Sequence, residues 1–279
     1  MTRCLNRPIP LVLVSRKGAA RIASGHPWIF SSDILDRGIA APGDAVTVRD
    51  PQGRLLGTAH YSASSQITLR LLSSRAEPVD RDFLARRIEA AAAFRQRVVS
   101  GTDAYRLVYS EADGLPGLIV DRYGDYLVVQ ALDQGMDRLL PEIVSCLQAL
   151  FSPAGIAARN DVPVRRKEGL PLETKTLAGD IPDQVAVHMN GLTFHADLLR
   201  GLGSESVVAV SGRVAHEPRA PMGLKIRIEQ IEVIAPVRET LPLQINKAEL
   251  KAGLDTQLDH RAVSLRAPRM RAIFRVQHE

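Results

Sequence analysis

The chain has 279 residues, of which 45% are apolar and 24% are charged, a balance typical of a soluble globular protein with two or three small domains. It holds no run of 18 or more apolar residues, so the sequence predicts no membrane span and the apolar run at 9–14 is interpreted as a core strand. The two cysteines, Cys4 and Cys146, predict no disulfide framework, so we expect a protein of a reducing, cytoplasmic compartment.

Positive charge is concentrated at the front of the chain. The net charge is +5, and residues 1–75 carry ten lysines and arginines against four acidic residues. Residues 76–200 carry 14 lysines and arginines against 18 acidic residues, and residues 201–279 carry 12 lysines and arginines against 9 acidic residues. A basic head of this kind indicates contact with a polyanion such as RNA, although arginine-rich usage is also what a GC-rich genome produces.

Short strands separated by turns dominate residues 9–75. The alternating segment 45–48 is followed by the turn Asp50-Pro51-Gln52-Gly53 and by a returning segment at 55–59, which predicts a hairpin. A further alternating segment covers 66–71. Many short strands at close spacing predict a small β-barrel.

Residues 76–201 mix helices and strands. Apolar residues recur at helical spacing across 80–100, with Asp80 as the expected N-cap, and a second helix is expected over 137–151. Asn190-Gly191 predicts a two-residue hairpin turn between two apolar segments. Strands are expected at 105–109, 118–121, 126–130, 156–160, 185–188 and 192–195. This part is therefore α+β.

The string Gly25-His26-Pro27-Trp28-Ile29-Phe30-Ser31 contains the single tryptophan of the chain, and Arg16-Lys17-Gly18 precedes it. Together with the segment 57–62, this set resembles the N-terminal PUA domain of the large-subunit rRNA cytosine-5 methyltransferases, which use S-adenosylmethionine. The resemblance implies a barrel that holds structured RNA through basic side chains. The expected RNA-binding residues are Arg16, Lys17, Arg21, His26 and Arg70.

Several of these residues have an alternative structural interpretation. Trp28 is expected to be a core aromatic residue that seals the barrel, and Lys17 and Arg21 could belong to an ordinary solvated surface. His26 could contact RNA or cap a turn, and the sequence does not separate the two.

The resemblance to the same family continues to about residue 201. It is carried by Tyr105-Arg106-Leu107-Val108, the loop 111–125, Arg159-Asn160-Asp161 and the segment 190–201, where the family passes into its methyltransferase domain. In the loop, the carboxylates Glu111, Asp113 and Asp121 could be taken for an acid/base or metal site. Their spacing around glycine and proline instead indicates a loop whose polar side chains hold its own backbone.

The sequence assigns no catalytic, cofactor-binding or metal-binding residue. A class I methyltransferase needs a core strand and then a Gly-rich turn for S-adenosylmethionine, and Gly201-Leu202-Gly203 has no such strand before it. No counterpart of the family's nucleophilic cysteine is found, because Cys146 lies on the apolar face of a helix and Cys4 lies near the terminus. S-adenosylmethionine is therefore expected only as the cofactor of the resembled family.

Strands are again expected after Gly203. One covers 207–214, and the segment 224–234 is either a pair of strands or one bulged strand. A proline-bearing linker at 236–242 and a short helix from Pro268 are expected to follow.

The tail carries a second resemblance. The segments 206–223 and 254–261 are similar to an aspartyl-tRNA synthetase of the archaeal or non-discriminating type. The resemblance implies the last strands of an anticodon-binding OB-fold, which cannot close as a barrel because such a fold needs five strands. Arg266, Arg269 and Arg271, with Arg275, could form a basic edge that contacts tRNA, and the alternative is an ordinary solvated helix face.

We therefore expect an α+β multidomain chain with a PUA-like barrel at 1–75, an α+β middle domain at 76–201 and a partial OB-like tail at 202–279. The first functional hypothesis is an RNA-binding protein that lacks the catalytic domain. The alternatives are an S-adenosylmethionine-dependent rRNA methyltransferase or a subunit that recruits one, a tRNA-binding accessory, and a fusion of two unrelated reading frames. The expected partners are rRNA or tRNA, with no membrane. For the tail we expect either a homodimer formed through it or disorder of it.

Overall fold

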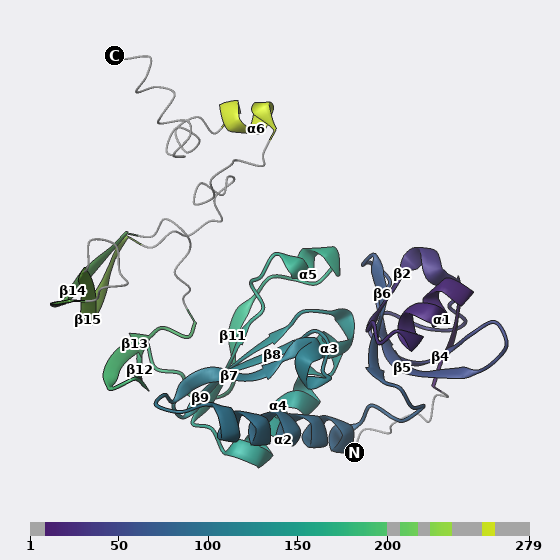
Figure 1. The fold of residues 1–279 in the computed structure, drawn as a ribbon, viewed down its shortest axis with the longest axis horizontal. Coiled ribbons are helices and arrows are strands. Elements are labelled where there is room, and N and C mark those ends of the chain that lie inside the picture. The colour runs from purple at the N-terminus through teal and green to yellow at the C-terminus, as the bar shows by residue number, and fades with distance from the viewer. Residues whose placement is uncertain (1–8, 200–206, 217–223, 236–252, 260–279) are drawn as a thin grey trace. The chain divides into compact units, whose positions relative to one another are not determined.

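The computed structural model describes residues 9–199, 207–216, 224–235 and 253–259. The chain divides into two compact units, residues 1–200 and residues 201–279 (Figure 1). The first unit contains a curled six-stranded sheet followed by a five-stranded sheet with helices, so the expected mixture of α and β structure is confirmed. Within the described residues, no helix is long and apolar enough to cross a membrane.

A six-stranded sheet forms the front of the first unit, in the order β2-β6-β5-β4-β1-β3. Its two edge strands, β2 and β3, are consecutive in the chain and are joined by the short 3-10 turn Ser31–Asp33, so the sheet must curl to bring its edges together. Alternate residues of its strands point into one apolar core. The elements are β1 Leu11–Val14, α1 Arg16–Ala23, β2 Trp28–Phe30, β3 Ile34–Asp36, β4 Ala45–Arg49, β5 Leu55–Tyr61 and β6 Ile67–Ser73.

The alternation predicted for β4 explains how this core forms. Val46 and Val48 are fully buried, while the residues between and beside them are half-buried. They meet Val12 and Val14 of β1, which lies parallel to β4, and Leu69 of β6. The period of two thus places every second side chain of neighbouring strands in the same core.

A five-stranded sheet in the order β11-β10-β9-β8-β7 forms the middle domain, and helices α2 and α4 pack on one of its faces (Figure 1). Strands β9 and β10 are parallel, and the crossover between them consists of α3 and α4. The strands are β7 Ala104–Tyr109, β8 Leu118–Tyr123, β9 Tyr126–Ala131, β10 Gly155–Arg159 and β11 Thr174–Gly179. The helices are α2 Arg81–Val98, α3 Gln134–Arg138, α4 Leu140–Phe151 and α5 Val164–Lys167.

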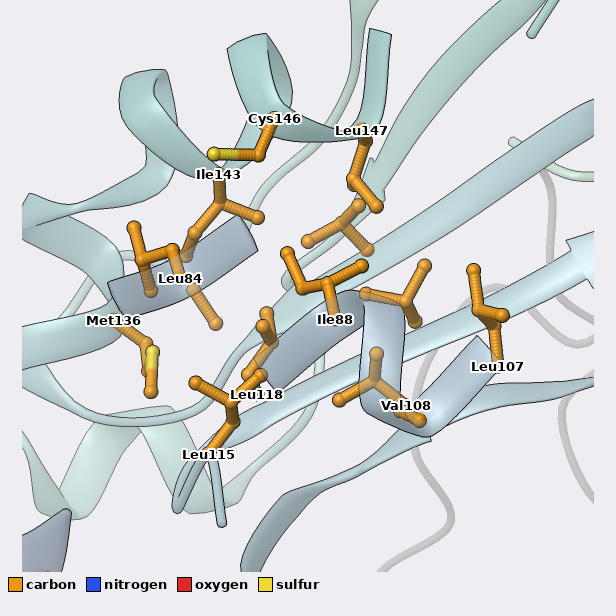
Figure 2. Packing of buried hydrophobic residues seen from close by; sticks show 14 of the residues in the cluster. Leu84, Ile88, Leu107, Val108, Leu115, Leu118, Met136, Ile143, Cys146 and Leu147 are labelled. Atoms are coloured by element: carbon orange, nitrogen blue, oxygen red, sulfur yellow. The ribbon is translucent and has the colours of Figure 1, made fainter. Parts of the chain in front are cut away.

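Helix α2 begins where the sequence predicts. The carboxylate of Asp80 accepts a hydrogen bond from the backbone N–H of Phe83 at 2.9 Å, which satisfies one of the unpaired donors of the first turn. The apolar residues at helical spacing, including Leu84 and Ile88, are fully buried against the sheet and α4 (Figure 2). Each buried side chain of this size stabilises the fold by about 1.5–3 kcal/mol.

Cys146 of α4 lies in this same core, where Figure 2 shows it beside Ile143. Its side chain is 1% exposed, and the Sγ atom lies 3.6 Å from the carbonyl oxygen of Arg81. Burial raises the pKa of the Cys146 thiol above its ordinary value, which suppresses the thiolate. The interpretation of this cysteine as a core residue is confirmed.

A hairpin covers the other face of the middle sheet. It consists of β12 Val185–Met189 and β13 Leu192–Ala196, joined at Asn190 and Gly191, whose φ angles are +51° and +78°. Two positive φ angles in succession are the requirement of the predicted tight turn. The hairpin packs through Val185 and Val187.

Several elements differ from expectation, and three of them have a clear physical reason. The helix expected over 137–151 is split into α3 and α4, because Pro141 has no N–H and its ring would meet the carbonyl group of Asp137 in a continuous helix. Helix α1 was not expected, since it has only eight residues and contains a glycine. Strand β11 was not expected because it is a largely exposed edge strand without apolar alternation.

In the second unit, β14 Val207–His216 pairs antiparallel with β15 Leu224–Ala235. The segment 224–235 is thus one strand with register shifts, which settles the two forms left open by the sequence. A two-stranded ladder and the short helix α6 Leu254–Asp259 do not make an OB-fold, so the OB-like tail is not confirmed. Cys4, the linker at 236–242, the helix from Pro268, and Arg266, Arg269 and Arg271 lie outside the described residues.

Candidate nucleic-acid interface

The first turn of α1 presents two exposed cations, Arg16 and Lys17. Ser15 caps this helix by accepting a hydrogen bond from the N–H of Gly18 at 3.1 Å. A Cβ atom on Gly18 would lie 3.2 Å from the Cβ of Asp33, so glycine lets the helix pack closely on the sheet. Cations at a helix N-terminus oppose the helix dipole, so these two residues do not serve the stability of α1 and are suited to an anion from outside.

Arg21 is partly engaged within the barrel. One of its terminal nitrogens lies 3.3 Å from the carboxylate of buried Asp33, and its guanidinium lies 4.7 Å from the centre of the Phe30 ring. A quarter of the Arg21 side chain is exposed, compared with 3% of that of Asp33. Arg21 lies on the same helix as Arg16 and Lys17. The ion pair orients its guanidinium and leaves part of it accessible.

His26 and Trp28 are tied to each other. The Nδ1 atom of His26 accepts a hydrogen bond from the backbone N–H of Trp28 at 3.1 Å, so His26 does cap the turn before β2. Trp28 is half-buried and is not part of the barrel core. Its Nε1–H instead donates to Glu111 of the middle domain at 2.8 Å. The tryptophan thus connects the barrel to the 3-10 turn Ser110–Asp113 of the middle domain.

The other two carboxylates of the loop hold the middle domain together. Asp113 forms two hydrogen bonds of 2.7 Å with Arg95 and accepts the backbone N–H of Tyr109. Asp121 binds Arg106 on the neighbouring strand at 2.8 Å. The structural interpretation of these carboxylates is confirmed, with the difference that Glu111 binds the barrel.

Arg70 is placed inside the molecule and not on its surface. It is 8% exposed, and its guanidinium lies 2.7 Å from Glu168 and 3.7 Å from Asp133. The second carboxylate oxygen of Glu168 accepts the hydroxyl of Ser62 at 2.6 Å. The expectation that Arg70 contacts RNA does not agree with this burial, because the carboxylates of Glu168 and Asp133 already engage its guanidinium. The sequence around Arg70 does not indicate that its partner is Glu168, which lies 98 residues further along the chain.

His60 completes the contact between the barrel and the middle domain, which we call the seam and define by His60, Ser62, Arg70, Asp133 and Glu168. The His60 ring is 2% exposed and fills the space above Gly135, where any Cβ atom would overlap it. Its Nδ1 atom lies 3.7 Å from Asp133, and neither ring nitrogen has a hydrogen-bond partner within the described residues. Burial acts to raise the pKa of Asp133, but His60, Arg70 and the N–H of Met136 outweigh it and hold that pKa below its ordinary value.

The described residues do not fit S-adenosylmethionine. The cofactor would be expected beyond the carboxyl end of a parallel strand, at a turn with free backbone. After β9 this turn is occupied, because the Asp133 carboxylate caps α3 at the N–H of Met136 and Gly135 lies under the His60 ring. After β10, Asn160 bonds back to the N–H of Ala131. The described part of the chain also holds no group of three potential metal ligands.

Comparison with known proteins identifies the domain at the front of the chain and a set of relatives. Residues 12–74 match the family model of the PUA-like domain. The chain is 38% identical over 195 residues to "Ribosomal RNA large subunit methyltransferase I" of Cronobacter sakazakii, an alignment that covers 68% of this chain and 49% of the relative. The protein of the same name from Vibrio cholerae is 40% identical over 180 residues, an alignment that covers 63% of this chain and 45% of the relative. The chain thus spans about half the length of the curated relatives it matches, and it is homologous to them.

The fold has counterparts among solved structures. A protein from Streptococcus mutans described as an S-adenosylmethionine-dependent methyltransferase superposes with a TM-score of 0.58 at 19% identity, covering 68% of this chain and 49% of that one. This likeness concerns the fold alone. The resemblance of the tail to aspartyl-tRNA synthetase finds no support in these comparisons.

Replacing Arg70 tests the seam. In Arg70→Met the carboxylates of Glu168 and Asp133 stay buried without their cation, so we expect the free energy of unfolding to fall by about 3–5 kcal/mol in urea denaturation. The control Arg86→Met removes an ion pair with Glu77 in which the arginine and glutamate side chains are 64% and 28% exposed, and it should cost less than about 1 kcal/mol. Equal losses in the two variants would show that the seam pair is no different from a surface pair.

The acid sensitivity of the seam follows from Asp133. Because its pKa is lower in the folded chain, its contribution is present above the unfolded pKa of about 3.9 and is lost as pH falls through the folded pKa. We therefore expect the difference in unfolding free energy between wild type and Asp133→Asn to shrink as pH falls from about 5 toward 2. A difference that stays constant over this range would contradict the assignment.

Proposed function

We propose that this chain acts in the methylation of large-subunit rRNA, and that its PUA-like barrel and middle domain hold the RNA. The observation that supports this most directly is the pair of exposed cations at the start of α1, on a domain that is fixed to the middle sheet by the seam. Phosphate contacts made by such side chains supply most of the affinity for structured RNA and little sequence readout. The name of the relatives gives the RNA class.

The proposed contact surface comprises Arg16, Lys17, Arg21 and His26, and it omits Arg70. Two further cations, Arg166 and Lys167 of α5, were missed in the sequence because the segment lacks a recognisable motif. Both are exposed, and the next residue in the chain is Glu168 of the seam. The seam therefore fixes a second basic element relative to the barrel.

The more specific hypothesis, methyl transfer to carbon 5 of a cytosine in 23S rRNA, rests on the family resemblance. We assign RNA recognition to the described residues and assign methyl transfer to none of them, because they do not fit the cofactor. A second candidate function is RNA binding without methyl transfer by this chain. It is favoured because the described residues do not fit S-adenosylmethionine. Calorimetry with S-adenosylmethionine separates the two, since micromolar binding supports the first and rules out the second.

The three-part division at residues 75 and 201 belongs to the same proposal. So does a homodimer formed through residues 202–279, because β14 and β15 each pair on one side only among the described strands. A tRNA partner has no described residue to support it.

A salt titration tests RNA binding. We expect the affinity for a stem–loop RNA from large-subunit rRNA to fall with salt, and the double variant Arg16→Ala/Lys17→Ala to lower the slope of log K against log salt by about 1–2. The matched double variant Arg37→Ala/Arg54→Ala removes the same charge from exposed positions of the same barrel and should keep the wild-type slope. An affinity independent of salt would contradict the proposal, and equal slopes in the two double variants would remove α1 from the interface.

A further inference from the structure

The middle domain has a cavity at the end of its sheet, around the turn between β8 and β9. Its volume is about 560 Å³, and its walls come from β7, from this turn and from strand β12 of the hairpin. Small-molecule sites have volumes of about 300–1,000 Å³, so the space is adequate for one nucleotide. Neither the seam nor the basic turn of α1 belongs to it.

Backbone and side-chain hydrogen bonds hold the walls in place. Asp103, directly before β7, donates its N–H to the carbonyl oxygen of His188 at 3.0 Å and accepts the N–H of His188 on its carboxylate at 2.6 Å. The same residue's carbonyl oxygen accepts the N–H of Gly124 in the turn at 2.9 Å. At the tip of the hairpin, Asn190 donates its N–H to Gly101 at 2.7 Å. The cavity is therefore formed before any ligand arrives, which limits the entropy lost on binding.

Arg122 and Tyr105 provide adjacent binding groups. They are register partners on β8 and β7, so their side chains leave the sheet next to each other. The Nε atom of Arg122 donates to the carbonyl oxygen of Gly124 at 2.8 Å, while its two terminal nitrogens make no hydrogen bond with any described residue. A guanidinium anchored at Nε with both terminal nitrogens available suits a phosphate group. Tyr105 packs against the apolar core of the middle domain and also lines the cavity, so the part of its ring that faces the cavity offers aromatic surface to a base.

The remaining polar groups suit the other parts of a nucleotide. The Nδ1 atom of His188 lies 2.9 Å from the Asp103 carboxylate, so that carboxylate is already paired and Nε2 of the ring is available. Gln184 and the exposed Asp125 also line the cavity. An amide and a carboxylate can bond the edge of a base or the ribose hydroxyls.

We propose that this cavity binds one unpaired nucleotide of the RNA, with its base on Tyr105 and its phosphate at Arg122. The inference rests on the proposed function, because it supplies a single-stranded contact beside the phosphate contacts of α1. Sequence-specific RNA recognition depends on unstacked bases of this kind, held on aromatic side chains.

The probes are the four nucleoside monophosphates and inorganic phosphate, added to the full chain and followed by NMR. We expect the nucleotides to shift the amide signals of Tyr105, Arg122 and His188, and phosphate alone to bind more weakly. Arg122→Gln should weaken nucleotide binding at least about tenfold, because it removes a charged hydrogen bond. Tyr105→Leu keeps an apolar side chain and should weaken it about 5- to 100-fold. The control Arg106→Gln changes the same charge at the next position of β7, outside the cavity, and should bind like wild type.

Unchanged nucleotide binding in Arg122→Gln, shifts that map elsewhere, or an equal response to phosphate alone would overturn the inference. A parallel RNA titration of the same samples keeps the two proposals apart. If RNA binds with the expected salt dependence while nucleotides leave these signals unchanged, the cavity proposal fails and the proposed function stands. If RNA does not bind, the proposed function itself fails.

Discussion

The buried pair between Arg70 of the barrel and Glu168 of the middle domain is the contact on which the first unit depends. A guanidinium and a carboxylate lose their hydration when buried, and only close geometry and further hydrogen bonds offset that loss. Here the pair is 2.7 Å long, and Ser62 and Asp133 bind the remaining groups. Such a pair adds little net stability compared with an apolar contact. It disfavours any other arrangement of the two domains, because a shift of one domain against the other would leave a buried charge without its partner.

This constraint links the fold to the proposed function. Structured RNA holds its phosphates at defined spacings, and several phosphate contacts add up only if the protein holds its cations at matching positions. The seam orients α1 relative to α5, which carries Arg166 and Lys167 beside Glu168. It also occupies the turn after β9, where the Asp133 carboxylate and Gly135 face the barrel. The position where an α/β sheet commonly binds a ligand is thus used here to join two domains.

The sequence predicts the elements whose formation depends on local chemistry. Asp80 caps α2, and Asn190-Gly191 forms its turn because only residues that tolerate positive φ fit there. The burial of Arg70 could not be predicted in this way, since its partner lies 98 residues further along the chain and a buried cation looks like an exposed one in a sequence. For the same reason the indole of Trp28 was assigned to the barrel core, although it reaches Glu111. The OB-like tail was inferred from a resemblance that covered only part of a fold, and its described strands form a two-stranded ladder.

We expect the seam to hold the barrel and the middle domain as one rigid body in solution. Residual dipolar couplings of backbone amides test it directly, because every rigid group of residues reports its own alignment tensor. We predict that amides of residues 11–73 and of residues 81–199 fit a single tensor with the relative orientation seen here. Two different tensors, or a reduced tensor magnitude for one of the two domains, would contradict the account.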